Sequence, residues 1–236
     1  IAGYSRELFI LIGVLFLGVS VATVFLGTLF PLVYEVIFDQ KLSVGFPYFN
    51  KVFIPLMIPV LFLIPIGPLS GWGKNVLALL FNKVSKIGML SIILAIMIPF
   101  VSSKVVFSYL PTTVKEMSFY GILGLILGFW IILGTLKFMI QKIKSKGGIK
   151  GLSFGAMGMI LAHCGMGITV LGITVVLEYQ QERDVAIKVG QSVKIAEYEV
   201  KFQALQRVES QNTVGYQGRF VVLEPGKKNF EMLPEK

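Results

Sequence analysis

His163 is the side chain with the clearest capacity for chemistry inside an apolar segment of this sequence. It is the only histidine among 236 residues. It lies about twelve residues into an apolar run, which at ~1.5 Å per residue is ~18 Å along a helix and near the middle of a bilayer. Ionisable residues at that depth are costly and usually functional, and a neutral imidazole can ligate haem iron through one ring nitrogen. A neutral histidine that hydrogen-bonds a neighbouring helix is the other interpretation.

The residues around His163 are small or soft. Gly158, Ala162 and Gly165 recur at i, i+4 and i+7 and therefore share one helix face. Small residues let a second helix or a flat cofactor approach the backbone, and for the glycines alone plain helix packing is the simpler interpretation. Met166 carries a thioether that competes as an iron ligand, although methionine in a membrane helix usually serves packing.

The sequence lacks the residue sets of hydrolytic and zinc sites. Its single cysteine, Cys164, excludes an internal disulfide and a thiolate zinc site built from this chain alone. There is no second histidine and no nucleophile elbow. The charged string Glu182-Arg183-Asp184 is either a functional cluster facing a substrate or a solvated group of ion pairs at the membrane exit. No catalytic residue is assigned from the sequence.

Long apolar runs must position His163. Hydrophobic residues make up 55% of the chain and charged residues only 15%, far from the balance of a soluble domain. Backbone polar groups cannot stay unpaired in lipid, so runs of this length predict transmembrane helices. The predicted spans are 8–33, 52–73, 87–107, 117–138 and 152–177. The segment 74–86 is either a short interfacial helix or an early start of the third span.

The region after the last run changes its period to two. Val185, Ile187 and Val189 alternate with other residues, and further alternating stretches precede and follow turn signals at 190–191 and 224–227. The fold class is therefore an all-α polytopic membrane protein with about five transmembrane helices, within 1–178, followed by a C-terminal extramembrane β-rich segment, within 179–236. The chain begins with Ile1 and we expect it to be truncated, an excerpt from a longer protein.

Lysine placement predicts the orientation and excludes nucleic acid as a partner. The formal charge is +9, but the lysines lie in loops and form no basic stripe with aromatic residues. The loops that carry lysine without acid follow the second and fourth runs, and such loops are cytoplasmic. These lysines are Lys74, Lys83, Lys86, Lys142, Lys144, Lys146 and Lys150. Residues after 177 are then expected on the outer side, with the lipid bilayer as the surroundings of the spans.

Several strings, in order along the chain, resemble the CcmF family of haem lyase subunits of cytochrome c maturation. The strings are SRE at 5–7, LGTLFPLV at 26–33, LSVGFPYFN at 42–50, GPLSGWG at 67–73, AHCGMG at 162–167, ERDV at 182–185 and EK at 235–236. Their spacing is similar to that of the family's C-terminal half. Some relatives carry paired asparagines after the first string, where this chain has Leu8-Phe9-Ile10-Leu11.

The resemblance implies a function in covalent haem attachment. Members take haem from a periplasmic haem-carrying chaperone and join its vinyl groups to the cysteines of a CxxCH motif in apocytochrome c, together with other cytochrome c maturation membrane subunits. They also hold a b-type haem, haem b, between two transmembrane histidines. His163 matches the second of these and is implied to be an axial ligand of the iron. The implied location is the bacterial plasma (inner) membrane with the C-terminal segment periplasmic, or the mitochondrial inner membrane.

A second function class stays open at this point. In a transporter or channel subunit, His163 would relay protons or serve packing. Transporters often show internal repeats and paired broken helices, and no repeat is visible among the predicted spans, although the proline-rich second span leaves room for a broken helix. As a haem lyase component, this chain by itself is expected to be inactive.

Overall fold

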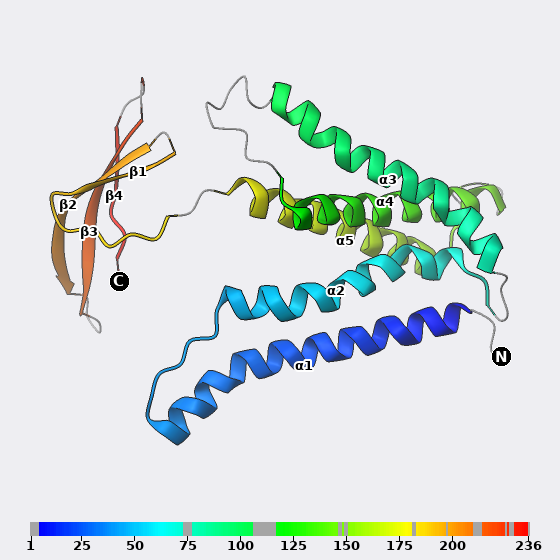
Figure 1. Ribbon diagram of the computed structural model, residues 1–236, viewed down its shortest axis with the longest axis horizontal. Helices are drawn as coiled ribbons and strands as arrows, with labels where there is room; N and C mark the ends of the chain where they lie inside the picture. Colours follow the sequence, from blue (N-terminus) through cyan, green and yellow to red (C-terminus); the bar gives the residue numbers. More distant parts are fainter. Residues whose placement is uncertain are drawn as a thin grey trace. The chain divides into compact units, whose positions relative to one another are not determined.

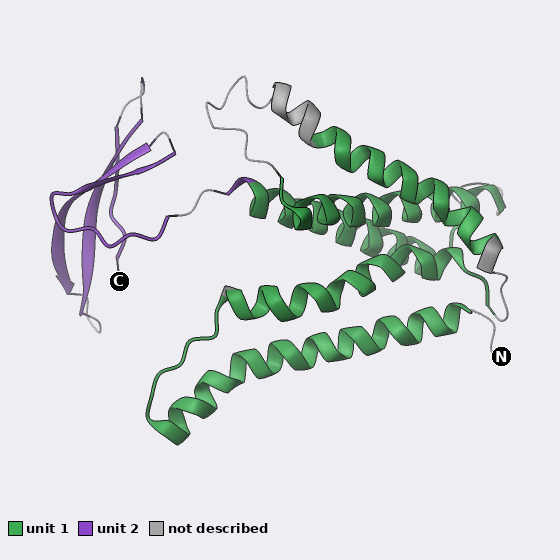
Figure 2. Cartoon of the chain, viewed as in Figure 1, with its two compact units in different colours: residues 1–178 green, residues 179–236 purple. Residues whose placement is uncertain are grey.

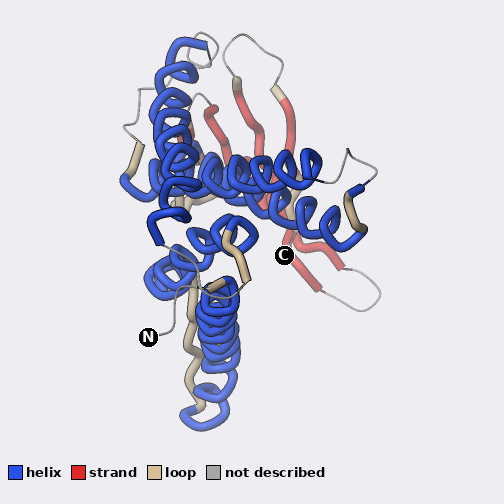
Figure 3. The backbone as a smooth tube through the Cα atoms, turned by 90° about the vertical axis from the view of Figure 1, so that its right-hand side faces the viewer, coloured by secondary structure: helices blue, strands red, loops and turns tan. Residues whose placement is uncertain are grey.

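The structure is a computed structural model that describes residues 5–72, 77–105, 117–145, 148, 151–180, 183–196, 198–209, 214–224, 226 and 229–235. The chain divides into two compact units, Ile1–Glu178 and Tyr179–Lys236, which Figure 2 distinguishes by colour. Helices occupy the first unit and strands the second, as Figure 3 shows. Five long apolar helices followed by an antiparallel sheet confirm the predicted fold class.

Each of the five helices is long and apolar enough to cross a membrane. They are α1 (Arg6–Phe38), α2 (Phe46–Leu69), α3 (Leu77–Val105), α4 (Phe119–Ser145) and α5 (Phe154–Tyr179), as labelled in Figure 1. The ambiguous segment before the third span is its early start, because α3 begins at Leu77. Residues 74–76 and 106–107, which belong to the predicted loop and third span, lie outside the described residues.

Helix α2 stays helical through four internal prolines, at positions 55, 59, 65 and 68. Proline removes a backbone donor, and in a membrane neighbouring helices make that loss tolerable. Pro65 lies inside the bundle, with its side chain fully buried. It packs so closely on Gly134 of α4 that a methyl group at that position would overlap the proline ring.

Helix α4 lies at the centre of the first unit. Its Ile131 is fully buried, and Trp130 is only 6% exposed. The Trp130 ring stacks on Phe62 of α2 at 5.5 Å between centroids, and its Nε1–H donates to the Phe62 carbonyl at 2.9 Å. On the other side, a Cβ added to Gly88 of α3 would lie 3.4 Å from the same indole ring. Trp130 therefore joins three helices and satisfies its polar group at the same time.

Small residues form the contact between α4 and α5. A Cβ added to Gly128 of α4 would lie 2.6 Å from Leu171 and 3.3 Å from the Gly167 carbonyl oxygen. A Cβ added to Gly167 of α5 would lie 3.2 Å from the Gly128 carbonyl oxygen in return. Nearer the other end, Gly124 faces the Thr174 hydroxyl group. Backbones approach each other this closely only where side chains are absent.

The second unit is a four-stranded antiparallel meander with strand order β1-β2-β3-β4. Its strands are β1 (Ser192–Ile195), β2 (Tyr198–Glu209), β3 (Val214–Leu223) and β4 (Phe230–Met232). Phe202 and Phe220 are register partners whose rings stack 4.6 Å apart, on a face that also carries Val200 and Val222.

The prediction of a strand at 185–189 was wrong. Residues 185–189 belong to no strand, and pairing begins only where Gly190 N donates to the Phe202 carbonyl at 2.7 Å. The turn lies at 189–190, one residue before the predicted position, with Gly190 at φ 89°. Of the predicted turn at 224–227, Pro225 and Lys227 lie outside the described residues, and Gly226 has φ 77°.

Candidate functional site

His163 is held in one tautomer by its own helix. It lies in the third turn of α5, about 14 Å along the axis from Phe154 at ~1.5 Å per residue. Its Nδ1 is 2.8 Å from the carbonyl oxygen of Met159, one turn earlier. A carbonyl can only accept, so Nδ1 carries the hydrogen. The lone pair of the neutral ring is then on Nε2, the nitrogen that ligates metals when Nδ1–H is bonded to a carbonyl.

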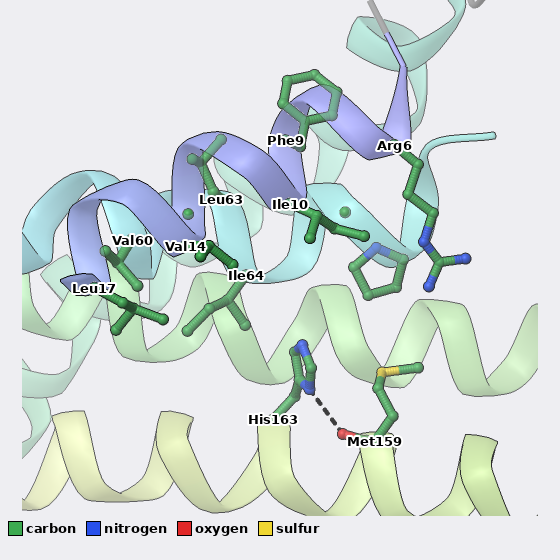
Figure 4. Close-up of a pocket in the computed structure, with 13 residues that line it drawn as sticks. Arg6, Phe9, Ile10, Val14, Leu17, Val60, Leu63, Ile64, Met159 and His163 are labelled. Atoms are coloured by element: carbon green, nitrogen blue, oxygen red, sulfur yellow. Dashed lines mark hydrogen bonds between the residues drawn. The ribbon is translucent and has the colours of Figure 1, made fainter. Parts of the chain in front are cut away.

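The imidazole of His163 enters a cavity of about 280 Å³ between α1, α2 and α5. Figure 4 shows the ring rising from α5 with one nitrogen bonded to Met159 and the other directed toward the side chains of α1 and α2. The lining is mainly aliphatic and aromatic, and includes Phe9, Ile10, Val14, Leu17, Val60, Leu63, Ile64 and Met159. An apolar chamber of this kind suits a flat hydrophobic ring more than a hydrated ion.

Two glycines keep this cavity open. Gly13 of α1 and Gly67 of α2 both line it. A Cβ added to either would meet no atom within 4 Å. The space beside His163 is therefore not filled by side chains of the described residues, and larger residues at these positions would occupy it.

Arg6 is the charged residue of the cavity lining. It starts α1, and its backbone N–H donates to the Gly71 carbonyl just beyond the end of α2 at 3.1 Å. Its guanidinium lies over the Trp72 ring, 4.9 Å from Cζ to the centroid. In the sequence, Arg6 belongs only to the string SRE at 5–7 and was not predicted as a site residue. The signal was present, since Arg6 is followed by Glu7 and then by a long uncharged run.

The face of α5 that carries Gly158 and Gly165 lies on the other side of the helix from His163. Gly158 and Gly165 are about 140–160° from His163 around a helix of 3.6 residues per turn, and therefore point away from the cavity. A Cβ at Gly158, Gly165 or Gly172 would contact nothing within 4 Å among the described residues. The close glycine contact on the His163 side is made instead by Gly167, which packs on α4.

Met166 follows His163 by three residues but does not line the same cavity. It lines a second apolar cavity, of about 380 Å³, between α2, α4 and α5. At one end of that cavity Glu178 accepts hydrogen bonds from the backbone N–H and the hydroxyl group of Ser118. Met159, not Met166, is the methionine of the His163 cavity. Among the described residues no three His, Cys, Asp or Glu side chains gather as a metal site, so His163 is a single donor.

The charged string after α5 is partly described. Arg183 donates from a guanidinium nitrogen to the Lys194 carbonyl of β1 at 2.9 Å, and thus ties the chain to the edge of the sheet. Asp184 is exposed, and Glu182 lies outside the described residues. Among the loop lysines, Lys83, Lys86, Lys142 and Lys144 are exposed on helices, and Lys74, Lys146 and Lys150 lie outside the described residues.

Comparison with known proteins identifies relatives along the whole chain. Residues 178–236 match the family model described as the CcmF C-terminal beta-sandwich. The cytochrome c-type biogenesis protein CcmF of Escherichia coli K12 is 32% identical over 234 residues, which are 99% of this chain and 34% of that protein. The cytochrome c-type biogenesis protein CycK of Rhizobium meliloti is 31% identical over 243 residues, with 100% of this chain and 34% of that protein covered.

A solved structure, that of the Cytochrome c Heme Lyase CcmF, shares the fold. It superimposes with a TM-score of 0.58 at 18% identity and covers 97% of this chain and 35% of that chain. The chain thus spans about a third of the length of the curated relatives it matches. Together, the matched domain, the whole-length relatives and the shared fold show that this chain belongs to the CcmF-type family of cytochrome c-type biogenesis proteins.

Proposed function

We propose that this chain is part of a haem lyase of cytochrome c maturation and that His163 is one axial ligand of a b-type haem. The observation that carries the second half of this proposal is the His163 tautomer. With Nδ1–H committed to the Met159 carbonyl, the Nε2 lone pair is available on the side of the ring that faces the cavity. Family membership supports the first half, through relatives described as cytochrome c-type biogenesis proteins.

The residues of the cavity fit a haem. One unpaired imidazole nitrogen suits the iron, and the aliphatic lining from α1 and α2 suits the porphyrin face. Gly13 and Gly67 leave open space beside the ring, and Arg6 adds one positive charge at the lining. A bound haem would supply a one-electron redox centre, and the role of this chain is to position it and to exclude water from one side. The second axial ligand is proposed to come from a part of the protein not included in this sequence.

The proposed substrates and partners follow the family. Haem delivered by a periplasmic chaperone would be joined to the CxxCH cysteines of apocytochrome c, with other cytochrome c maturation membrane subunits assisting. The proposed location is the bacterial inner membrane, with the sheet of the second unit on the periplasmic side. Lysine-rich loops after the second and fourth helices support this orientation.

The test replaces His163 by alanine in the full-length protein. We expect the purified variant to lose most of its haem and to show an altered reduced absorption spectrum, while the protein stays in the membrane. Met159→Leu is the matched control, because it keeps the carbonyl that holds Nδ1–H and removes only the thioether. This control should keep wild-type haem content. The same holds for Met166→Leu, which lies at the other cavity.

Unchanged haem content and spectrum in His163→Ala would remove the ligand role. His163 would then be a packing residue or a proton relay, as in a transporter. Loss of haem in Met166→Leu, with haem kept in His163→Ala and Met159→Leu, would instead assign the iron to the second cavity.

A further inference from the structure

We infer that Arg6 binds a carboxylate of the ligand in the His163 cavity, namely a propionate of the proposed haem. The inference rests on the proposed function, because it needs a haem at His163. It assigns a new role to a residue on a different helix, 157 positions away in the sequence (163 − 6). It also predicts which edge of the macrocycle faces the end of the bundle where α1 begins.

The Arg6 side chain has a hydrogen-bond donor without an acceptor among the described residues. This donor is Nε, which is buried. Leaving a charged donor without an acceptor is expensive, since bonds to charged groups are worth more than ordinary ones. An acceptor from a ligand would remove this cost.

The position of Arg6 also favours a shared ligand with His163. Arg6 and His163 line the same cavity, and Figure 4 shows both side chains reaching into the space between the helices, Arg6 from α1 and His163 from α5. Ile10, one turn after Arg6 on α1, lines the same cavity and extends its apolar side chain toward His163 in Figure 4. In a haem, the iron lies at the centre of the macrocycle and the propionate carboxylates lie at its edge. The His163 imidazole, the apolar lining and the Arg6 guanidinium offer partners for these parts in the same cavity.

The Arg6 side chain is also preorganised for an acceptor. The Arg6 guanidinium is placed over the Trp72 ring, and the backbone N–H of Arg6 is bonded to Gly71. A cation–π contact of this kind restrains the guanidinium without using its N–H donors. The five donors of the fork are directed within the guanidinium plane, which is the geometry that carboxylates bind in a bidentate manner.

The experiment compares haem with its dimethyl ester, in which both propionates are neutral. Haem-depleted full-length protein in detergent is titrated with each compound, and binding is followed by absorption. The wild-type protein should bind haem on the order of 10- to 100-fold more tightly than the diester, the range expected for a hydrogen-bonded charge. Arg6→Gln should weaken haem binding by a similar factor, leave diester binding unchanged and so abolish the preference. Arg6→Lys should keep part of it.

Two further variants separate the possible results. Arg183→Gln removes an exposed guanidinium of the second unit and should keep the full preference for haem. His163→Ala should weaken binding of haem and diester equally. If His163→Ala weakens neither compound, the proposed function itself fails. If His163→Ala weakens both while Arg6→Gln keeps the preference for haem, only the Arg6 inference is wrong.

The ratio of the affinities for haem and for the diester also identifies other roles for Arg6. If Arg6→Gln weakens haem and diester by the same factor, Arg6 acts through the Trp72 and Gly71 contacts on the shape of the cavity, which contradicts the inference. If Arg6 instead holds the phosphate of a lipid headgroup, the ratio is the same in Arg6→Gln and wild type, which contradicts it equally. The inference survives only when the ratio falls toward one.

Discussion

Replacement of Gly167 by alanine should separate α4 from α5 and destabilise the helical unit. The new Cβ would lie 2.6 Å from Ile132 Cγ1, 3.4 Å from Ile131 Cγ2 and 3.2 Å from the Gly128 carbonyl oxygen. An isoleucine side chain can rotate, but the carbonyl belongs to the backbone of α4 and moves only with the helix. Overpacking of this kind costs typically ~1–3 kcal/mol.

Gly158→Ala is the matched control on the same helix. A Cβ there meets no atom within 4 Å. Both substitutions gain the same intrinsic helix preference of alanine over glycine, about 0.5–1 kcal/mol in water, so this gain cancels in the comparison. The difference between the two variants therefore isolates the clash. At ~2 kcal/mol it would change the ratio of folded to unfolded protein about 30-fold.

The assay is equilibrium unfolding of the full-length variants in mixed micelles with increasing SDS, followed by circular dichroism. We expect Gly167→Ala to unfold at lower SDS than wild type and Gly158→Ala at the same or higher SDS. Gly128→Ala, the reciprocal position, should also destabilise. The double variant should lose less than the sum, because one methyl group already moves the helices apart. If Gly167→Ala and Gly158→Ala unfold at the same SDS concentration, the close contact between Gly167 and α4 is refuted.

Four other predictions concern the cavity, the Trp130 indole, the sheet and the orientation in the membrane. Gly13→Leu fills the open space beside His163 without meeting another atom within 4 Å at Cβ, so the full-length variant should fold normally and lose co-purified haem; normal haem content would contradict the position of the cavity. Trp130→Phe leaves the Phe62 carbonyl without its donor and should cost about 1 kcal/mol in SDS unfolding, whereas Trp72→Phe, at an exposed ring, should cost less. In hydrogen exchange, amides of β2 and β3 should exchange slowly and those of 185–189 fast. Reporter fusions at Lys146 and Gly190 should read cytoplasmic and periplasmic, respectively, and the reverse result at both sites would invert the predicted orientation.

The sequence was sufficient for the features that depend on local physics. Lipid cannot satisfy backbone polar groups, so uncharged runs of this length had to be helices. The period of two after Glu178 indicated strands, because side chains alternate between the two faces of a sheet. The sequence also identified the single histidine deep in an apolar run as the strongest candidate metal ligand, because an ionisable residue at that depth is costly and rare.

The errors fall where partners decide the outcome. Residues 185–189 alternate like a strand but have no neighbouring strand to pair with, and a ladder needs both. The glycines of α5 looked equivalent in the sequence, yet Gly167 contacts α4 while Gly158 and Gly165 face away from it. The neighbouring helices determine which face of a helix makes close contacts.

The site itself is also a tertiary feature. Helical geometry one turn apart brings His163 Nδ1 to the Met159 carbonyl, but the apolar cavity that His163 lines exists only through the packing of α1, α2 and α5. The same packing places Arg6, at the beginning of the first helix, in the lining of the cavity that His163 of the last helix also lines. Residue types limit what chemistry is possible, whereas the packing of helices distant in sequence determines which residues act together.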